Sequence, residues 1–94
     1  MADTLQDLRK SLDLIDNALI LLLAERFHIT EKVGVYKKEH KLNPVDPERE
    51  AAQFARIEKL AGEAGLNPAF AHKFLRLVID EVVTNHKALQ GKEA

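Results

Sequence analysis

The first forty residues carry an apolar stripe at helical spacing. Its members recur in steps of three and four between Leu8 and Tyr36, which is the spacing of one face of an α-helix. No proline interrupts this stretch, and its one glycine, Gly34, costs a helix only about 1 kcal/mol relative to alanine. The pattern predicts a single helix that ends at about His40. The stripe consists of Leu8, Leu12, Ile15, Leu19, Leu22, Arg26, Ile29, Val33 and Tyr36.

This predicted helix is too long for a domain of its size. It begins near Asp3 or Thr4, where Asp3 followed by Gln6 resembles a capping box. At about 1.5 Å per residue the helix spans roughly 55 Å. That is about twice the diameter expected for a globule of 94 residues. The chain cannot bury such a helix alone, so we expect a second copy to cover it.

Two further helices are predicted, and each begins with a capping residue followed by proline. The first is capped by Asp46, begins at Pro47 and runs to about Glu63, before Gly65, which suits a left-handed cap. The second is capped by Asn67, begins at Pro68 and ends near Gln90. No segment alternates with the period of a strand, so the expected fold class is all-α. We expect one domain over 1–94 with three helices, dimerised through the long one. The candidate inner face of the helix that begins at Pro47 consists of Ala52, Phe54 (or Ala55), Ile57 and Leu60. The helix that begins at Pro68 carries Phe70, Phe74, Leu77, Val78 and Val82 at helical spacing.

The composition argues against several classes of protein. A net charge of -1 lacks the basic excess of a nucleic-acid or membrane-surface binder. The chain has no cysteine, and its histidines are not at metal-ligand spacing, so we expect neither disulfides nor a metal site. The longest apolar run, 18–24, is too short to span a membrane. The first residues do not resemble a signal peptide, and a cytoplasmic protein is expected.

Arg26 is the one charged member of the apolar stripe. A guanidinium on a buried face must be paired or must meet an anionic ligand, because an uncompensated buried charge is very costly. Lys37 lies on the same helix face roughly 16 Å away, which leaves room for a small organic anion between the two cations. The alternative is an internal salt bridge from Arg26 to Glu50 or Glu81.

Three other charged or polar residues are candidates for function. Arg9 is roughly 25 Å from Arg26, so it reaches the same pocket only from an antiparallel partner helix, and otherwise it is a surface arginine. Arg49 stands in the first turn of the second predicted helix, where the dipole disfavours a cation unless an anion or carboxylate lies beside it. His86 is on the third helix, and a lone histidine there is more often an ordinary polar-face residue.

Several short motifs follow one another in a fixed register: Leu8-Arg9, Asp16, Leu22-Leu23-Ala24-Glu25-Arg26, Val33-Gly34, Lys37 and Val45-Asp46-Pro47-Glu48-Arg49-Glu50. Together they resemble the all-helical class of chorismate mutase, over residues 5–89. The family's fold is an intertwined homodimer of three-helix chains, so the resemblance implies that architecture here. It also implies the Claisen rearrangement of chorismate to prephenate, on the way to phenylalanine and tyrosine, with no cofactor and no metal.

The resemblance assigns three cations to a substrate with two carboxylates. Arg26 is expected to bind one carboxylate through two hydrogen bonds. Arg9, from the other subunit, is expected to bind the second carboxylate. Lys37 is expected to donate to the breaking ether oxygen and to a carboxylate. With His86, Arg26 and Lys37 are the expected catalytic residues.

The remaining positions include two departures from the family pattern. Glu50 is expected to accept from the ring hydroxyl with help from the backbone of Asp46, and Arg49 to orient neighbours at the pocket edge. Val82 stands where the family often has a serine that holds a carboxylate, and His86 where it has glutamine or protonated glutamate beside the ether oxygen. Histidine can donate there and valine cannot, so we expect weaker substrate binding and a pH-dependent rate.

Three alternatives remain at this point. Isochorismate pyruvate-lyase resembles the same family closely and also uses a cationic pocket. A non-catalytic helical dimer could serve as a binding or regulatory module, with the central arginine in a structural ion pair. A third possibility is a weak mutase that gains activity from a partner enzyme of the shikimate pathway.

Overall fold

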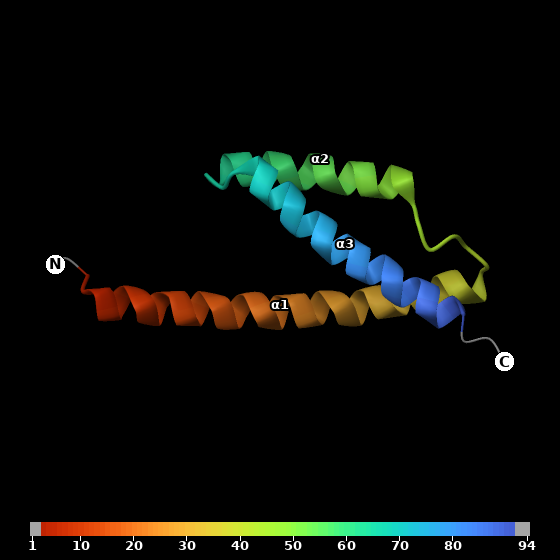
Figure 1. The fold of residues 1–94 in the computed structure, drawn as a ribbon, viewed down its shortest axis with the longest axis horizontal. Helices are drawn as coiled ribbons and strands as arrows, with labels where there is room; N and C mark the ends of the chain where they lie inside the picture. Colours follow the sequence, from red (N-terminus) through yellow and green to blue (C-terminus); the bar gives the residue numbers. More distant parts are fainter. Residues whose placement is uncertain (1–2, 92–94) are drawn as a thin grey trace. The chain divides into compact units, whose positions relative to one another are not determined.

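The computed structural model describes residues 3–91, and these form three helices joined by short loops (Figure 1). No strand occurs within the described residues, so the all-α, three-helix prediction is confirmed. The chain divides into two compact units, one up to Thr30 and one from Glu31 onward. The helices are α1 (Leu5–Glu39), α2 (Pro47–Glu63) and α3 (Pro68–Gln90).

The long helix α1 is capped by Thr4. Its hydroxyl accepts a hydrogen bond from the backbone N–H of Asp7 at 3.1 Å, and the Asp7 carboxylate accepts from the Thr4 N–H at 3.3 Å. This reciprocal pair is a capping box. The predicted capping box of Asp3 and Gln6 is therefore wrong by one residue. Leu5 is the first helical residue, so the cap is Thr4 and its partner, three residues later, is Asp7.

Most apolar side chains of α1 are exposed in the single chain. Leu12, Leu22 and Tyr36 are 57%, 69% and 56% exposed, and Gly34 is the buried residue of the described helix. A contiguous apolar surface of this length marks an interaction face. The exposure agrees with the expectation that α1 needs a cover which its own chain does not supply.

Both later helices begin at the predicted residues. The Asp46 carboxylate accepts from the backbone N–H of Arg49 at 3.0 Å, and the Asn67 side-chain oxygen accepts from the N–H of Ala69 at 2.9 Å. Each bond satisfies a helix N–H that has no partner within the helix. A proline follows each cap, where its fixed φ suits the first helical position.

The first two helices end in the same backbone motif. After α2, Gly65 adopts φ +79, and the next residue's N–H donates to the Ala61 carbonyl at 2.8 Å. After α1, Lys41 takes the left-handed position at φ 56, and the following N–H donates to the Lys37 carbonyl at 2.8 Å. The glycine cap predicted for α2 is thus confirmed. The lysine accepts a conformation that costs a non-glycine residue roughly 1–2 kcal/mol.

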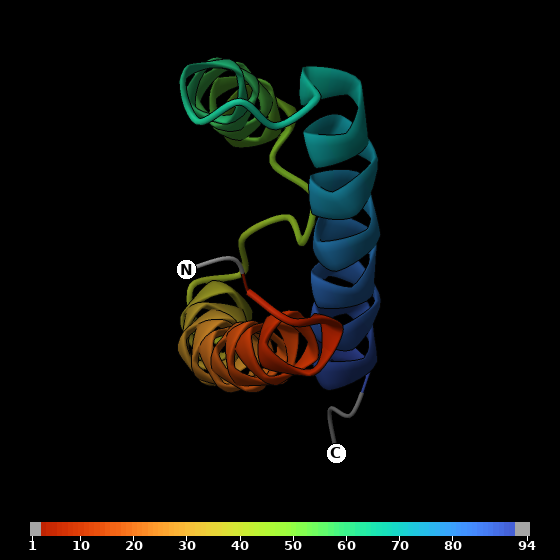
Figure 2. The ribbon, with the colours of Figure 1, turned by 90° about the vertical axis from the view of Figure 1, so that its left-hand side faces the viewer.

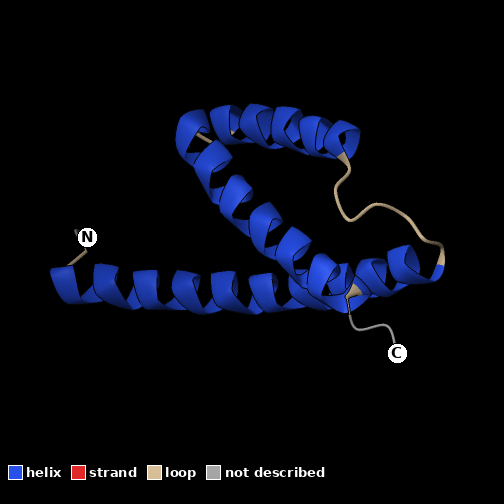
Figure 3. Cartoon of the chain, turned by 45° about the vertical axis from the view of Figure 1, so that its right-hand side comes forward, coloured by secondary structure: helices blue, strands red, loops and turns tan. Residues whose placement is uncertain are grey.

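The core of the second unit lies mainly on α3. Figures 1 and 2 show α2 and α3 diverging from the Gly65 turn, and α3 ends beside the last turns of α1 (Figure 3). Of the apolar residues at helical spacing on α3, Val78 is buried, whereas Phe70 and Leu77 are 56% and 70% exposed. On α2, likewise, Leu60 is 54% exposed. The buried apolar residues are Ala61, Ala71, Leu75, Val78 and Ile79.

Candidate functional site

The candidate site residues fall into both units of the chain. Arg9 and Arg26 belong to the first unit, where Arg9 is exposed and Arg26 is half-buried. The others belong to the second unit: Lys37 at the end of α1, Asp46, Arg49 and Glu50 at the start of α2, and Val82 and His86 on α3.

The ammonium of Lys37 is fixed to the loop that leads into α2. Its Nζ donates to the Pro44 carbonyl at 3.2 Å, and the side chain is half-buried. An ammonium has three N–H donors, so two stay available for an anionic ligand. The bond therefore orients Lys37 without using up its capacity to bind.

His86 lies against the backbone of α1 at Gly34. The histidine is only 4% exposed, and a Cβ built on Gly34 would lie 2.7 Å from its Cδ2 and 3.0 Å from its Nε2. The imidazole occupies the space that a side chain at position 34 would need. The reading of His86 as an ordinary polar-face residue is therefore wrong. Because Lys37 follows Gly34 by about one turn, it emerges on the same side of α1 as the histidine.

Val82 precedes His86 by one turn of α3 and is half-buried. Residues four apart on a helix lie on one face, so valine and histidine share a side of α3. Val82 brings no hydrogen-bond donor to that side.

Glu50 is paired with an arginine that the sequence analysis did not consider. Nη2 of Arg76 donates to Oε1 of Glu50 at 2.6 Å, and the Arg76 guanidinium lies over the Phe54 ring, 4.9 Å from its centroid. Nε of Arg76 faces the Asp80 carboxylate at 3.5 Å. Arg76 directly follows the buried Leu75. A cation next to the apolar face of α3 was the signal that could have identified it.

Asp46 is held by hydrogen bonds, whereas the side chain of Arg49 is exposed. The side chain of Asp46 caps α2, and its carbonyl accepts from the Glu50 N–H at 3.0 Å, so the residue is rigidly held. The side chain of Arg49 is exposed and makes no ion pair with residues 3–91. An unneutralised guanidinium at a helix N-terminus is well placed to receive an anion.

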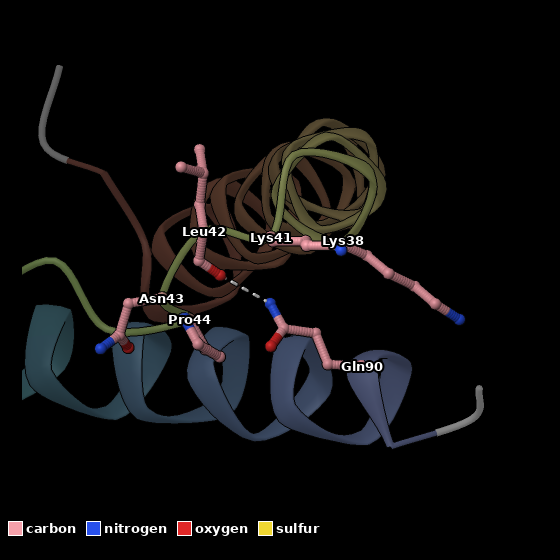
Figure 4. Close-up of a pocket in the computed structure, with 6 residues that line it drawn as sticks. All are labelled: Lys38, Lys41, Leu42, Asn43, Pro44 and Gln90. Atoms are coloured by element: carbon pink, nitrogen blue, oxygen red, sulfur yellow. Dashed lines mark hydrogen bonds between the residues drawn. The ribbon is translucent and has the colours of Figure 1, made fainter.

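A pocket of about 500 Å³ lies beside the loop between α1 and α2, but it does not contain the predicted site residues (Figure 4). One wall is closed where Nε2 of Gln90 donates to the Leu42 carbonyl at 2.9 Å. The C-terminal ends of α1 and α3 meet at this pocket. Lys38 and Lys41 line it close to the C-terminus of α1, where a positive charge offsets the helix dipole. The pocket is lined by Lys38, Lys41, Leu42, Asn43, Pro44 and Gln90.

Neither a metal cluster nor a membrane-spanning helix is present within residues 3–91. Within 3–91, no three or more of the side chains His, Asp and Glu gather closely enough to hold a metal ion. In the same part of the chain, no helix combines the length and apolar character needed to cross a membrane. The site residues themselves offer guanidinium, ammonium and imidazole donors, which bind and orient anionic groups.

Comparison with known proteins gives a consistent result. The family model for chorismate mutase type II matches residues 8–87. The chain is 33% identical over 90 residues to a chorismate mutase of Methanocaldococcus jannaschii, a match that covers 96% of this chain and 87% of that protein. It is 34% identical over 90 residues to a 4-amino-4-deoxychorismate mutase of Streptomyces pristinaespiralis, covering 96% and 67%. It is 36% identical over 85 residues to the T-protein of Enterobacter agglomerans, covering 90% of this chain and 23% of that protein.

Replacement of Gly34 by alanine is expected to displace the His86 ring. The added methyl overlaps the imidazole, so the free energy of unfolding should fall by about 1–3 kcal/mol, as measured by urea denaturation. Gly62→Ala is the matched control, because a Cβ there meets only Pro68 at 3.9 Å.

A double-mutant cycle identifies the partner in this clash. In a His86→Ala background the ring is gone, and Gly34→Ala should then cost much less. An equal loss in both backgrounds would contradict the contact as the cause.

Proposed function

Because the chain belongs to the type II chorismate mutase family, we propose that it catalyses the Claisen rearrangement of chorismate to prephenate. The observation that carries the proposal is the family match over residues 8–87, which includes every residue expected to touch the substrate. The M. jannaschii chorismate mutase, which matches 96% of this chain, supports the same activity.

The reaction suits the residues available. It is unimolecular and pericyclic, so the enzyme must hold a dianion in a compact reactive conformer and stabilise negative charge on the ether oxygen. An acceleration of about a million-fold requires roughly 8 kcal/mol. Positioning and a few charged hydrogen bonds supply energies of this size.

We assign the two carboxylates of chorismate to arginines. Arg26 binds one of them bidentately, and Arg9 of the partner subunit binds the other. Lys37 donates to the ether oxygen and to a carboxylate with the N–H groups that its Pro44 bond leaves available.

The remaining contacts with the substrate are assigned to residues at the start of α2 and on α3. Glu50 accepts a hydrogen bond from the ring hydroxyl with help from the Asp46 backbone, and Arg49 orients neighbours at the edge of the pocket. His86 donates to the ether oxygen, where its burial keeps the ring in one orientation. Val82 cannot donate, so the substrate is held more weakly than in a site with a hydroxyl at this position.

We further propose that the whole chain is one domain of an intertwined homodimer with shared active sites. The exposed apolar face of α1 supports this, because a second copy is a partner of matching length and character. We also propose that the protein is cytoplasmic and that it acts in aromatic amino-acid biosynthesis. Activation by another enzyme of the shikimate pathway is a further part of this proposal.

One comparison favours a second substrate. The S. pristinaespiralis relative is named a 4-amino-4-deoxychorismate mutase, and that compound carries an amino group in place of the ring hydroxyl. The same rearrangement of the amino compound is therefore the second candidate activity.

Purified protein is expected to convert chorismate to prephenate, identified by nuclear magnetic resonance of the reaction mixture. With isochorismate it should release neither salicylate nor pyruvate. Release of these two products would instead identify the lyase. Stable binding with no turnover of either compound would identify the non-catalytic module.

Mixing two inactive variants should restore activity if the sites are shared between subunits. Arg9→Ala and Arg26→Ala should each lower kcat/KM by at least about 10²-fold, since each removes a carboxylate clamp. Unfolding and refolding the two together should return about a quarter of wild-type activity, because half of the dimers then hold one intact site. A mixture no more active than its components would exclude sites built from two chains.

The rate is expected to depend on pH through His86. If the reaction requires the imidazolium as donor, kcat/KM is expected to fall as pH rises from 5 to 8. His86→Gln should keep activity and flatten the profile, since an amide N–H donates at every pH in this range. A wild-type profile that is already flat would remove the charged histidine from the mechanism.

A further inference from the structure

The pairing of Glu50 with Arg76 connects the first turn of α2 to the middle of α3. Nη2 of Arg76 lies 2.6 Å from Oε1 of Glu50, and the Glu50 side chain is only 19% exposed while that of Arg76 is 41% exposed. A charge-assisted bond of this length in a partly desolvated place is strong and directional. Arg76 therefore determines where one Glu50 oxygen lies.

Arg76 is itself held on two further sides. Its guanidinium lies over the Phe54 ring at 4.9 Å, and its Nε faces the Asp80 carboxylate at 3.5 Å. The Phe54 ring in turn stacks on His72, with ring centroids 4.3 Å apart. Packing on an aromatic face and contact with two carboxylates leave the guanidinium few alternative positions.

The ion pair with Arg76 leaves Glu50 able to accept further hydrogen bonds. A carboxylate has two oxygens and about four acceptor sites, and Arg76 takes one site on Oε1. Glu50 can still accept a hydrogen bond from a ligand. Its negative charge, however, is already paired with the positive charge of the Arg76 guanidinium.

We propose that Arg76 is a positioning and specificity residue that makes Glu50 select a neutral hydroxyl over an ammonium group on the substrate ring. The inference rests on the proposed function, in which Glu50 accepts from the ring substituent. A neutral ring hydroxyl can donate to the second carboxylate oxygen of Glu50 without bringing another positive charge close to Arg76. The amino group of 4-amino-4-deoxychorismate is protonated at neutral pH and would be a second cation beside the guanidinium, where like charges repel.

The test compares kcat/KM for chorismate and for 4-amino-4-deoxychorismate. Wild-type protein should prefer chorismate, and Arg76→Met should narrow that preference by at least about tenfold, because the methionine keeps the length of the side chain without its charge. Arg76→Lys keeps the cation and should keep the preference. Arg56→Met, at an exposed arginine of α2, is the matched control and should change neither value.

A purely structural role for Arg76 would lower both activities in proportion and leave their ratio unchanged. That result, in an Arg76→Met protein that folds as judged by circular dichroism, overturns the inference alone. Wild-type protein that converts neither compound overturns the proposed function as well.

A measurement on the wild-type protein covers the case in which Arg76→Met does not fold. The inhibition constant of the amino compound, divided by the KM for chorismate, should fall as rising pH removes the ammonium charge. A ratio that stays constant through the titration of the amine would overturn the inference, since the site would then not sense that charge.

Discussion

An apolar helix face that its own chain leaves exposed is the constraint on which the architecture depends. The 35 residues of α1 expose leucine and isoleucine along most of their length, while the buried core of the described chain is limited to small and branched residues of α2 and α3. Burial of apolar surface is the main favourable term in folding, so this face must be covered for the helix to persist. The proposed exchange of arginines between subunits follows from that need, because the helix proposed to dimerise also carries Arg9 and Arg26.

The ends of the helices could be predicted because their causes are local. Asp46, Asn67 and Gly65 each act on backbone groups within a few residues, and all three predictions are confirmed. The start of α1 near Asp3 or Thr4 was predicted, but its capping box lies one residue later than expected, since Asp3 and Thr4 are both good caps and the sequence does not rank them. The buried side of α3 could not be predicted, for a different reason. The helix is apolar on two sides, and periodicity cannot distinguish the side that faces α2 from the side that stays exposed.

The site was predicted less well than the helices, because its contacts join segments far apart in the chain. That His86 points inward depends on the absence of a side chain at Gly34, and nothing in the sequence near the histidine reveals this. Arg76 was missed because its partner Glu50 is 26 positions away on another helix. Arg76 follows the buried Leu75 directly, and this position beside the apolar face of α3 is the local signal for a charge that needs a partner.

The uncovered face of α1 also affects how the protein reaches its folded state. In the proposed homodimer the second chain covers the longest helix, so folding and association would become one bimolecular event. The stability of the protein would then rise with the logarithm of its own concentration, and its refolding would slow on dilution. In a cell, the amount of this protein would set not only how many active sites exist but also what fraction of chains is folded.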